Sequence, residues 1–287
     1  MWLIPLTIFF VAGTASNLLR RHLAQKEHLS PNLINLVFYV GFILPGGIIL
    51  GLALPHTFTP DLQTLGLLFF CSLIWPLYFL LAFKANKHID ASVFSMIADL
   101  SPIVTAMIAY FLFTERLTGV QIVGVVMLIL SGVIAMYPDI TSKVKVRIFG
   151  IQIALICMLL LGVGVAVEKL VYDVAGIGTY FLFCWTLQVL WMVIIARKEI
   201  HNLSSLFVDK RERTFVLLHG FSGLLRSASF AFALLLSTSA SLMNAASNFL
   251  TACILIAAYF ILGEKSNLRF KIAGSAVGLI GLFLVSF

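Results

Sequence analysis

Two short stretches of the chain are nearly identical: residues 109–116 read AYFLFTER and residues 258–265 read AYFILGEK. Each is an apolar run that ends in a glutamate followed by a basic residue, and the two copies lie 149 residues apart. A phrase repeated at this distance indicates that one structural unit occurs twice in the chain.

The composition indicates which solvent surrounds these units. Of the 287 residues, 61% are hydrophobic and 11% are charged, and the mean hydropathy is +1.08. A soluble domain has about 25% charged residues. Because so few polar side chains are available to cover a surface in water, the sequence predicts an integral membrane protein.

Membrane-spanning helices need roughly 20 mostly apolar residues to cross about 30 Å of hydrocarbon. Ten segments meet this requirement. They are expected at residues 2–22, 33–54, 63–84, 90–113, 118–137, 148–172, 177–196, 214–236, 238–262 and 267–286. The longest connection, residues 197–213, is predicted to lie along the membrane surface.

The offset of 149 holds along most of the chain: it aligns Glu115 with Glu264, and it also aligns several glycines. We therefore predict a first repeat over residues 1–137, a linker over 138–147 and a second repeat over 148–287. Five spans in each repeat is an odd number, so the second repeat is inverted in the membrane. The expected fold is all-α, with ten transmembrane helices in two inverted five-helix repeats, an arrangement typical of secondary transporters.

Residues 101–135 (SPIVTAMIAYFLFTERLTGVQIVGVVMLILSGVIA) and 248–285 (NFLTACILIAAYFILGEKSNLRFKIAGSAVGLIGLFLV) share a further pattern. In each, a helix ends on Thr-Glu or Gly-Glu, a short turn follows, and the next helix has spaced glycines. In this the chain resembles the drug/metabolite transporter (DMT) superfamily, in its EamA-type branch, over essentially its whole length. The resemblance implies a hydrophilic cavity between the halves, lined by helices 1, 3, 4, 6, 8 and 9, but it does not specify the substrate.

The repeated glutamates, Glu115 and Glu264, are interpreted as structural helix-turn residues, because each lies at a helix junction where a carboxylate complements the dipole of the next helix. Thr118 and Gln121 have the spacing of a capping box at the start of that helix. Small residues one turn apart, such as Gly47 with Gly51 and Gly274 with Gly278, predict close helix packing, within the chain or in a homodimer.

Two ionisable residues fall deep in the predicted spans: Asp99 about 13 Å and Arg226 about 18 Å along their helices, at 1.5 Å per residue. Charges at such depth are costly and are functional candidates by default. The residues 149 positions away are Asn248 and Leu77, so neither charge is repeated. This favours a role in substrate or ion chemistry, and the alternative is a buried salt bridge between the two charges.

The other candidate substrate-binding residues are polar or aromatic side chains of the predicted spans. They are Asn17, Trp75, Tyr78, Ser95, Trp185, Gln188, Asn244 and Asn248. Residues four apart share a helix face, which places Ser95 beside Asp99. For each aromatic residue the alternative is lipid contact or helix packing. Three charged residues near predicted helix ends, Lys84, Glu168 and Lys169, are expected to reach toward the membrane surface.

Enzymatic activity is not expected. The sequence His219-Gly220-Phe221-Ser222-Gly223 resembles an intramembrane serine protease motif, but that chemistry needs a base positioned against the serine, and this histidine lies on the same predicted helix. The four cysteines are isolated and offer no paired metal spacing. We expect no metal, no cofactor and no nucleic-acid partner.

Basic residues in short loops tend to face the cytoplasm. The odd-numbered connections carry 16 lysines and arginines, with Arg20 counted among them, and the even-numbered connections carry 2. This bias places both termini outside, whereas the family resemblance implies termini in the cytoplasm. The expected location is a bacterial plasma (inner) membrane.

The sequence therefore predicts a secondary transporter of small polar metabolites, with an amino acid or related zwitterion favoured. It would work by alternating access, with a proton as candidate coupling ion. Arg226 would hold an anionic group, Asp99 a cationic group or the proton, and Asn244 and Asn248 would orient the ligand. The alternatives are efflux of aromatic or cationic compounds, with cation–π contacts to Trp75, Tyr78 and Trp185, and a non-transporting membrane assembly protein.

Overall fold

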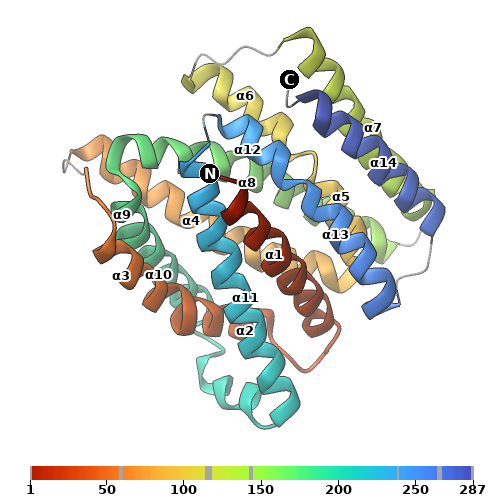
Figure 1. Cartoon of the computed structure of the whole chain (residues 1–287). Helices are drawn as coiled ribbons and strands as arrows, with labels where there is room; N and C mark the ends of the chain where they lie inside the picture. Colours follow the sequence, from red (N-terminus) through yellow and green to blue (C-terminus); the bar gives the residue numbers. More distant parts are fainter. Residues whose placement is uncertain are drawn as a thin grey trace.

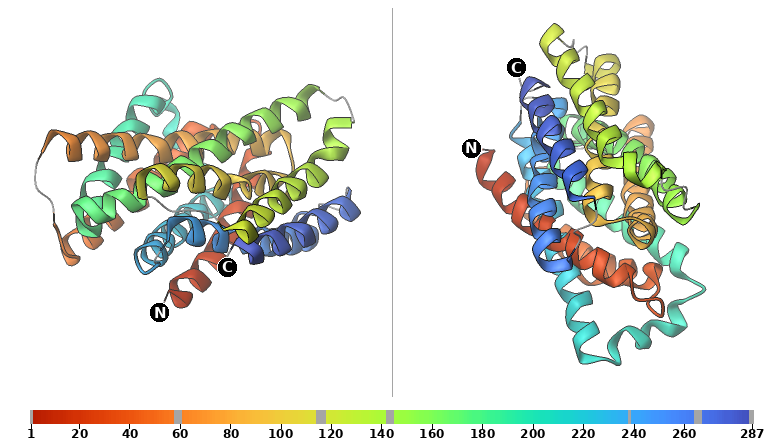
Figure 2. Two further views of the ribbon diagram at one scale, coloured as in Figure 1. Left: turned by 90° about the horizontal axis from the view of Figure 1, so that it is seen from above. Right: turned by 90° about the vertical axis from the view of Figure 1, so that its right-hand side faces the viewer.

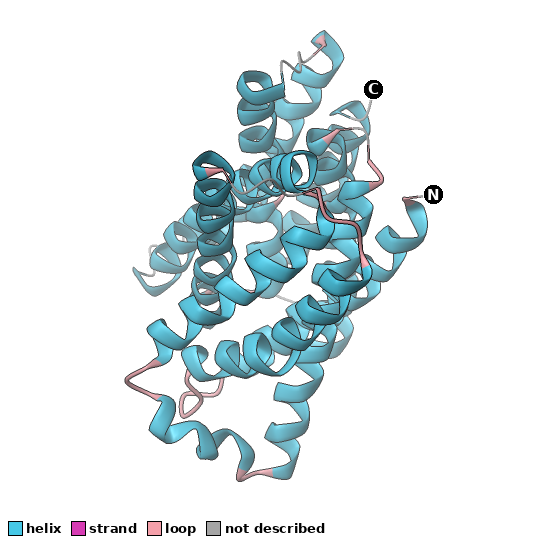
Figure 3. Cartoon of the chain, turned by 90° about the vertical axis from the view of Figure 1, so that its left-hand side faces the viewer, coloured by secondary structure: helices cyan, strands magenta, loops and turns pink. Residues whose placement is uncertain are grey.

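The computed structural model describes residues 2–57, 61–113, 118–141, 145–237, 239–263 and 267–285. These residues form helices and loops without a strand (Figure 3). The first half contains α1 (Leu3–Ala24), α2 (Pro31–Phe38), the π-helix η1 (Tyr39–Ile43), α3 (Leu44–Ala53), α4 (Leu62–His88), α5 (Ala91–Ala98), α6 (Ser101–Phe113) and α7 (Gly119–Thr141).

The second half continues the same pattern (Figure 1). It contains α8 (Lys145–Ala175), α9 (Ile177–Thr179), the π-helix η2 (Tyr180–Cys184), α10 (Trp185–Ala196), the 3₁₀-helix η3 (Ile200–Phe207), α11 (Lys210–Leu235), α12 (Ala240–Ser247), α13 (Phe249–Ala257), the π-helix η4 (Ala258–Leu262) and α14 (Leu268–Val285).

Seven helical stretches of the described chain are long and apolar enough to cross a membrane. They are Leu3–Ala24, Pro31–Ala53, Leu62–His88, Ala91–Phe111, Ile148–Ala175, Ile177–Ala196 and Lys210–Leu235. Gly119–Ile134 and Phe249–Leu262 are shorter apolar helices. Each of these stretches falls on a segment that was predicted from its apolar run.

Polar side chains set where several helices begin. Ser30 accepts hydrogen bonds from the amides of Asn32 and Leu33 at the start of α2. Thr118 and Gln121 form the predicted capping box, since the Thr118 amide donates to the Gln121 side chain at 2.8 Å and the Gln121 amide donates to the Thr118 hydroxyl at 3.3 Å. Glu115 and Glu264 themselves lie outside the described residues.

The long helices pack in pairs: α1 against α11, α4 against α8, and α7 against α14 (Figures 1 and 2). Glycine allows the close approaches between neighbours. A Cβ atom on Gly47 would lie 2.8 Å from the carbonyl oxygen of Phe181, and one on Gly51 would lie 2.8 Å from the Cβ of Leu182. The Ser131 hydroxyl donates to the carbonyl of Gly274 at 2.8 Å. These predicted glycine seams therefore pack within the chain.

Two of the helical segments are interrupted near their middle. The predicted span 90–113 was expected to be one helix, but α5 ends at Ala98 and α6 begins at Ser101. Pro102 explains the break, because proline has no amide to donate to Ala98 and disfavours helical geometry in the residue before it. The second break lies at Asn248, between α12 and α13. The two breaks touch, since the Asn248 side-chain amide donates to the Asp99 carbonyl at 2.9 Å.

Candidate functional site

A cavity lies where the two broken segments meet the long helices, with about 850 Å³ of empty space including its opening. Helices α1, α4, α5, α8, α11, α12 and α13 contribute to its wall, together with η1, η2 and α10. All ten predicted substrate-binding residues line it. They are Asn17, Trp75, Tyr78, Ser95, Asp99, Trp185, Gln188, Arg226, Asn244 and Asn248. The structure brings these residues together, and their roles in binding remain predictions.

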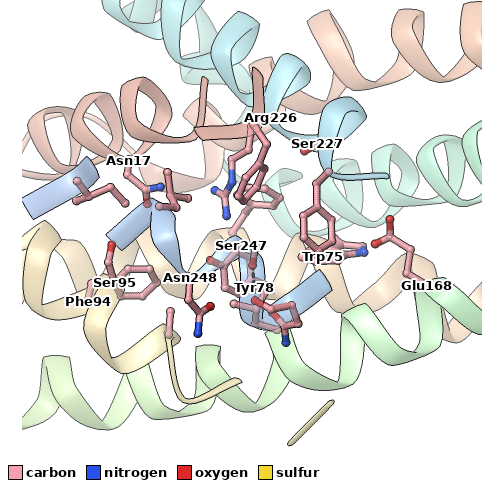
Figure 4. A pocket seen from close by; sticks show the side chains of 18 of the residues that line it. Asn17, Trp75, Tyr78, Phe94, Ser95, Glu168, Arg226, Ser227, Ser247 and Asn248 are labelled. Carbon is pink, nitrogen blue, oxygen red and sulfur yellow. Dashed lines mark hydrogen bonds between the residues drawn. The ribbon is translucent and has the colours of Figure 1, made fainter. Parts of the chain in front are cut away.

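Arg226 is 8% exposed and projects from α11 into the middle of the cavity, with Asn17 to one side and Trp75 to the other (Figure 4). Its Cζ atom lies 5.7 Å from the centre of the Phe79 ring and 6.0 Å from that of Phe9. These aromatic faces attract the cation, but Nη1 has no hydrogen-bond partner in the described structure.

Asp99 occupies the break between α5 and α6 and is 8% exposed. Its Oδ1 accepts a hydrogen bond from the Thr251 hydroxyl at 2.7 Å. Among the described residues, no ion pair joins Asp99 to Arg226. The alternative of a buried salt bridge between them is therefore absent from this conformation, and each charge faces the cavity separately.

The amide side chains of Asn244 and Asn248 are engaged across the two breaks. Asn244 donates to the Thr105 hydroxyl at 2.6 Å and accepts from Ser101 at 3.4 Å, while Asn248 donates to the Asp99 carbonyl. In this conformation both residues brace α5 and α6 against α12 and α13. A ligand would meet mainly their remaining acceptor capacity.

Four buried polar atoms on the cavity wall have no hydrogen-bond partner among the described residues. They are Tyr39 Oη, Trp75 Nε1, Gln188 Nε2 and Arg226 Nη1. All four can donate a hydrogen bond. Leaving buried donors unpaired costs about 1–3 kcal/mol each, so the wall is complementary to a ligand that is rich in acceptor atoms.

Glu168 is a cavity residue that the sequence interpretation placed wrongly. It was expected to reach toward the membrane surface from a helix ending at 172, but α8 continues to Ala175 and Glu168 is 2% exposed. The Tyr172 hydroxyl donates to its carboxyl group. Figure 4 shows the Trp75 indole nitrogen turned toward the same carboxyl. The neighbouring Lys169 instead pairs with Asp173 at 3.6 Å.

Arg20 was also misplaced, because it was counted as a loop residue. Helix α1 continues to Ala24, and Arg20 is completely buried with its Cζ atom 5.4 Å from the Phe79 ring centre. Lys271 was also counted among the 16 basic residues of the connections, although the predicted span 267–286 contains it. It lies in α14 and binds Asp90 at 2.8 Å, and Arg21 approaches the same carboxylate at 3.3 Å. The loop charge bias is therefore smaller than the sequence count.

The serine and histidine of the protease-like motif point to different partners. Ser222 donates to the backbone carbonyl of His219 at 3.1 Å, whereas the His219 ring approaches the Ser16 hydroxyl at 3.5 Å. The described geometry therefore does not place this ring as a base against Ser222. Within the described ranges, no group of three or more His, Cys, Asp or Glu residues is arranged to hold a metal ion.

Comparison with known proteins places the first half of the chain in a family. Residues 3–137 match the EamA-like transporter family. This family belongs to the DMT superfamily, and its match covers the first of the two halves. This confirms the predicted family, and together with the seven apolar helices it makes the chain a multi-pass integral membrane protein. EamA-like proteins are membrane transporters rather than enzymes.

A solved crystal structure shares the fold over the whole length. It aligns with a TM-score of 0.61 and covers 98% of this chain and 97% of its own, at 17% sequence identity. At that identity the likeness concerns the fold alone. None of the curated proteins matches the chain in sequence.

Proposed function

We propose that this EamA-like protein is a secondary transporter of small polar metabolites, with an amino acid or related zwitterion favoured. In the proposed architecture ten helices cross the membrane as two inverted repeats, residues 1–137 and 148–287, and the cavity opens to each side in turn. A bacterial plasma membrane with both termini outside remains the proposed location.

The packing supports this architecture. With an offset of 149, α1 corresponds to α8 and α4 corresponds to α11, so the packed pairs α1–α11 and α4–α8 are equivalent. The interruptions at Asp99 and Asn248 are also 149 residues apart and touch each other. Broken helices that meet near the membrane midplane are a recurrent feature of transporter binding sites.

The observation that carries the substrate proposal is the unpaired Nη1 of the Arg226 guanidinium. It lies on the cavity wall together with the unpaired donors of Tyr39 and Gln188, and this group would bind a carboxylate. Asp99 faces the same space without an ion pair to Arg226 and would bind an ammonium group. A zwitterion would satisfy both charges at once, whereas an uncharged ligand would leave each unpaired.

The test is flux in proteoliposomes with a mixture of labelled amino acids as probe. The wild type should show saturable uptake, with rates that differ between the two membrane orientations. Arg226→Leu copies Leu77, the residue at the corresponding position, and should lower uptake at least about tenfold, as expected for a lost charged hydrogen bond. Lys84→Gln, an exposed residue, is the matched loss of one positive charge. Wild-type flux in Arg226→Leu would remove this arginine from the site.

Efflux of aromatic cations is the second candidate, because Trp75, Tyr78 and Trp185 line the cavity near two carboxyl groups, Asp99 and Glu168. Aromatic faces can bind a cation without a counter-charge. This reading predicts that Arg226→Leu still transports a labelled aromatic cation and that Asp99→Asn does not. A non-transporting assembly role has less support, since the Gly47 and Gly51 seam is filled by the chain itself.

A further inference from the structure

Glu168 has no role in the proposed zwitterion site. Glu168 lies in the wall of the cavity and is 2% exposed. It is seven residues before Ala175, the last residue of α8. That places it about 10 Å inside the helix end at 1.5 Å per residue. The residue 149 positions earlier is Leu19, so the carboxyl group is no part of what the two halves share.

The groups around Glu168 are aromatic hydroxyls, an indole and thiols. The titratable ones are Tyr172 on α8, Tyr180 on η2 and Cys71 on α4, and Cys184 on η2 lies against Cys71. The nearest cation along the chain, Lys169, is held by Asp173 and by the carbonyl of Ser237 at 3.5 Å. Arg226 lines the same cavity from α11.

Within the described structure, no cation forms an ion pair with Glu168. An ionised carboxylate buried without a paired cation costs several kcal/mol. A proton removes this cost, because the neutral acid can keep accepting the hydrogen bond from Tyr172 and can donate one of its own. Asp99 differs, since its side chain and backbone both join the hydrogen bonds that brace the helix breaks.

We propose that Glu168 is the proton-coupling carboxyl of the transport cavity. In the occluded state one Glu168 oxygen carries a proton taken from water on one side of the membrane. When the cavity opens to the other side, the O–H bond breaks, the proton passes to water there, and the hydrated carboxylate remains until the cycle reverses. This role rests on the proposed transport function. Each transport cycle would move one proton across the membrane.

The first test needs no substrate. Infrared difference spectra of the purified protein, titrated from about pH 5 to 9 to span the range between ordinary acidic and basic side chains, should show the carbonyl stretch of a protonated carboxyl that disappears as pH rises. Glu168→Gln should lose this band, and Lys169→Gln, one residue away, should keep it. An unchanged band in Glu168→Gln would overturn the proposal.

The second test separates coupling from transport, again with the labelled amino-acid mixture as probe. An imposed pH gradient should drive accumulation by the wild type and by Lys169→Gln, while Glu168→Gln should still exchange probe but lose accumulation at least tenfold. Accumulation by Glu168→Gln at the wild-type level would overturn the coupling role. If the wild type exchanged the probe without any response to the pH gradient, the coupling role of Glu168 would be overturned and the transport proposal would stand. Absence of all flux would count against transport of these probes.

Discussion

Positions 149 residues apart show which features the two halves share and which they do not. Both halves have a helix break at the corresponding position, 99 and 248, and glycines at the corresponding packing positions, 13 with 162 and 132 with 281. The charged groups of the cavity occur once each. The position that corresponds to Asp99 is Asn248, the one that corresponds to Arg226 is Leu77, and the one that corresponds to Glu168 is Leu19. Shared positions therefore coincide with backbone geometry, and we expect the unshared ones to carry the chemistry.

The largest expected difference between the halves concerns the two residues at the breaks, each replaced by the residue found at the corresponding position. Asp99→Asn keeps an acceptor for Thr251, so we expect the melting temperature to change little while affinity for a zwitterion falls at least about tenfold through loss of a charged hydrogen bond. Asn248→Asp removes the donor to the Asp99 carbonyl, so it should lower stability by about 1–3 kcal/mol.

Thermal unfolding and isothermal binding on the same preparations separate these two effects. Equal losses of stability in both variants, with unchanged affinity for a zwitterion in Asp99→Asn, would show that Asp99 stabilises the break and does not bind the ligand.

The glycines at positions 13 and 162 offer a matched pair for packing. A Cβ atom on Gly162 would lie 2.5 Å from the Cβ of Val104 and 2.7 Å from the carbonyl of Ser101, whereas one on Gly13 would meet side-chain methyl groups of Leu250 at 3.0 and 3.1 Å. Because a leucine side chain can rotate and backbone cannot, Gly162→Ala should destabilise by about 1–3 kcal/mol. Gly13→Ala should cost less.

Gly66 is the control for helix propensity, since a Cβ atom there would meet nothing within 4 Å. Gly66→Ala should be neutral or stabilising by up to about 1 kcal/mol. Thermal melts of the three alanine variants in one detergent provide the measurement. A larger loss at Gly13 than at Gly162 would contradict the packing described for α8 against α6.

The smallest expected effect is a pH dependence of helix stability, which should differ between two helix caps in the first half. Hydrogen bonds from the Thr64 amide at 2.7 Å and hydroxyl at 2.8 Å lower the pKa of Asp61. Because the pKa is lowered, the cap contributes its full stabilisation of α4 when the pH is above the ordinary pKa of aspartate. This contribution is lost as the pH falls through the lowered pKa. The Ser30 cap of α2 has no such dependence.

Hydrogen exchange measured against intrinsic rates should therefore show protection at the start of α4 falling at acid pH, with α2 unaffected. Asp61→Asn can still accept the amide hydrogen bond and should remove the pH dependence. A variant that kept the wild-type dependence would show that another group titrates there.

Apolar runs were sufficient to place the helical segments, because a stretch long enough to cross the bilayer is visible in the sequence itself. The predicted segment 177–196 is Ile177–Ala196, although it contains a short π-helix that no sequence pattern indicated. The break at Asp99 was missed because apolar residues flank it on both sides. Pro102 was the available signal, but the partner that stabilises the break, Asn248, lies in the other half of the chain.

The cavity residues were predicted for a related reason: polar side chains inside apolar spans are expected to face the interior of the bundle. Glu168 and Arg20 were missed because the predicted spans ended too early, at 172 and 22, which made both look like residues near a membrane surface. Their depth depends on the last turn of each helix and on contacts with Tyr172 and Phe79, which a single sequence does not specify.

A thermal-shift screen of the purified protein tests the central claim most directly, with amino acids, nucleosides, sugars and organic cations as ligands. A ligand present at a hundred times its dissociation constant adds about 2.7 kcal/mol to the stability of the folded state. We predict that a zwitterion stabilises the wild type and fails to stabilise either Arg226→Leu or Asp99→Asn. Stabilisation by aromatic cations alone, retained in Arg226→Leu, would contradict a site built around the Arg226 guanidinium.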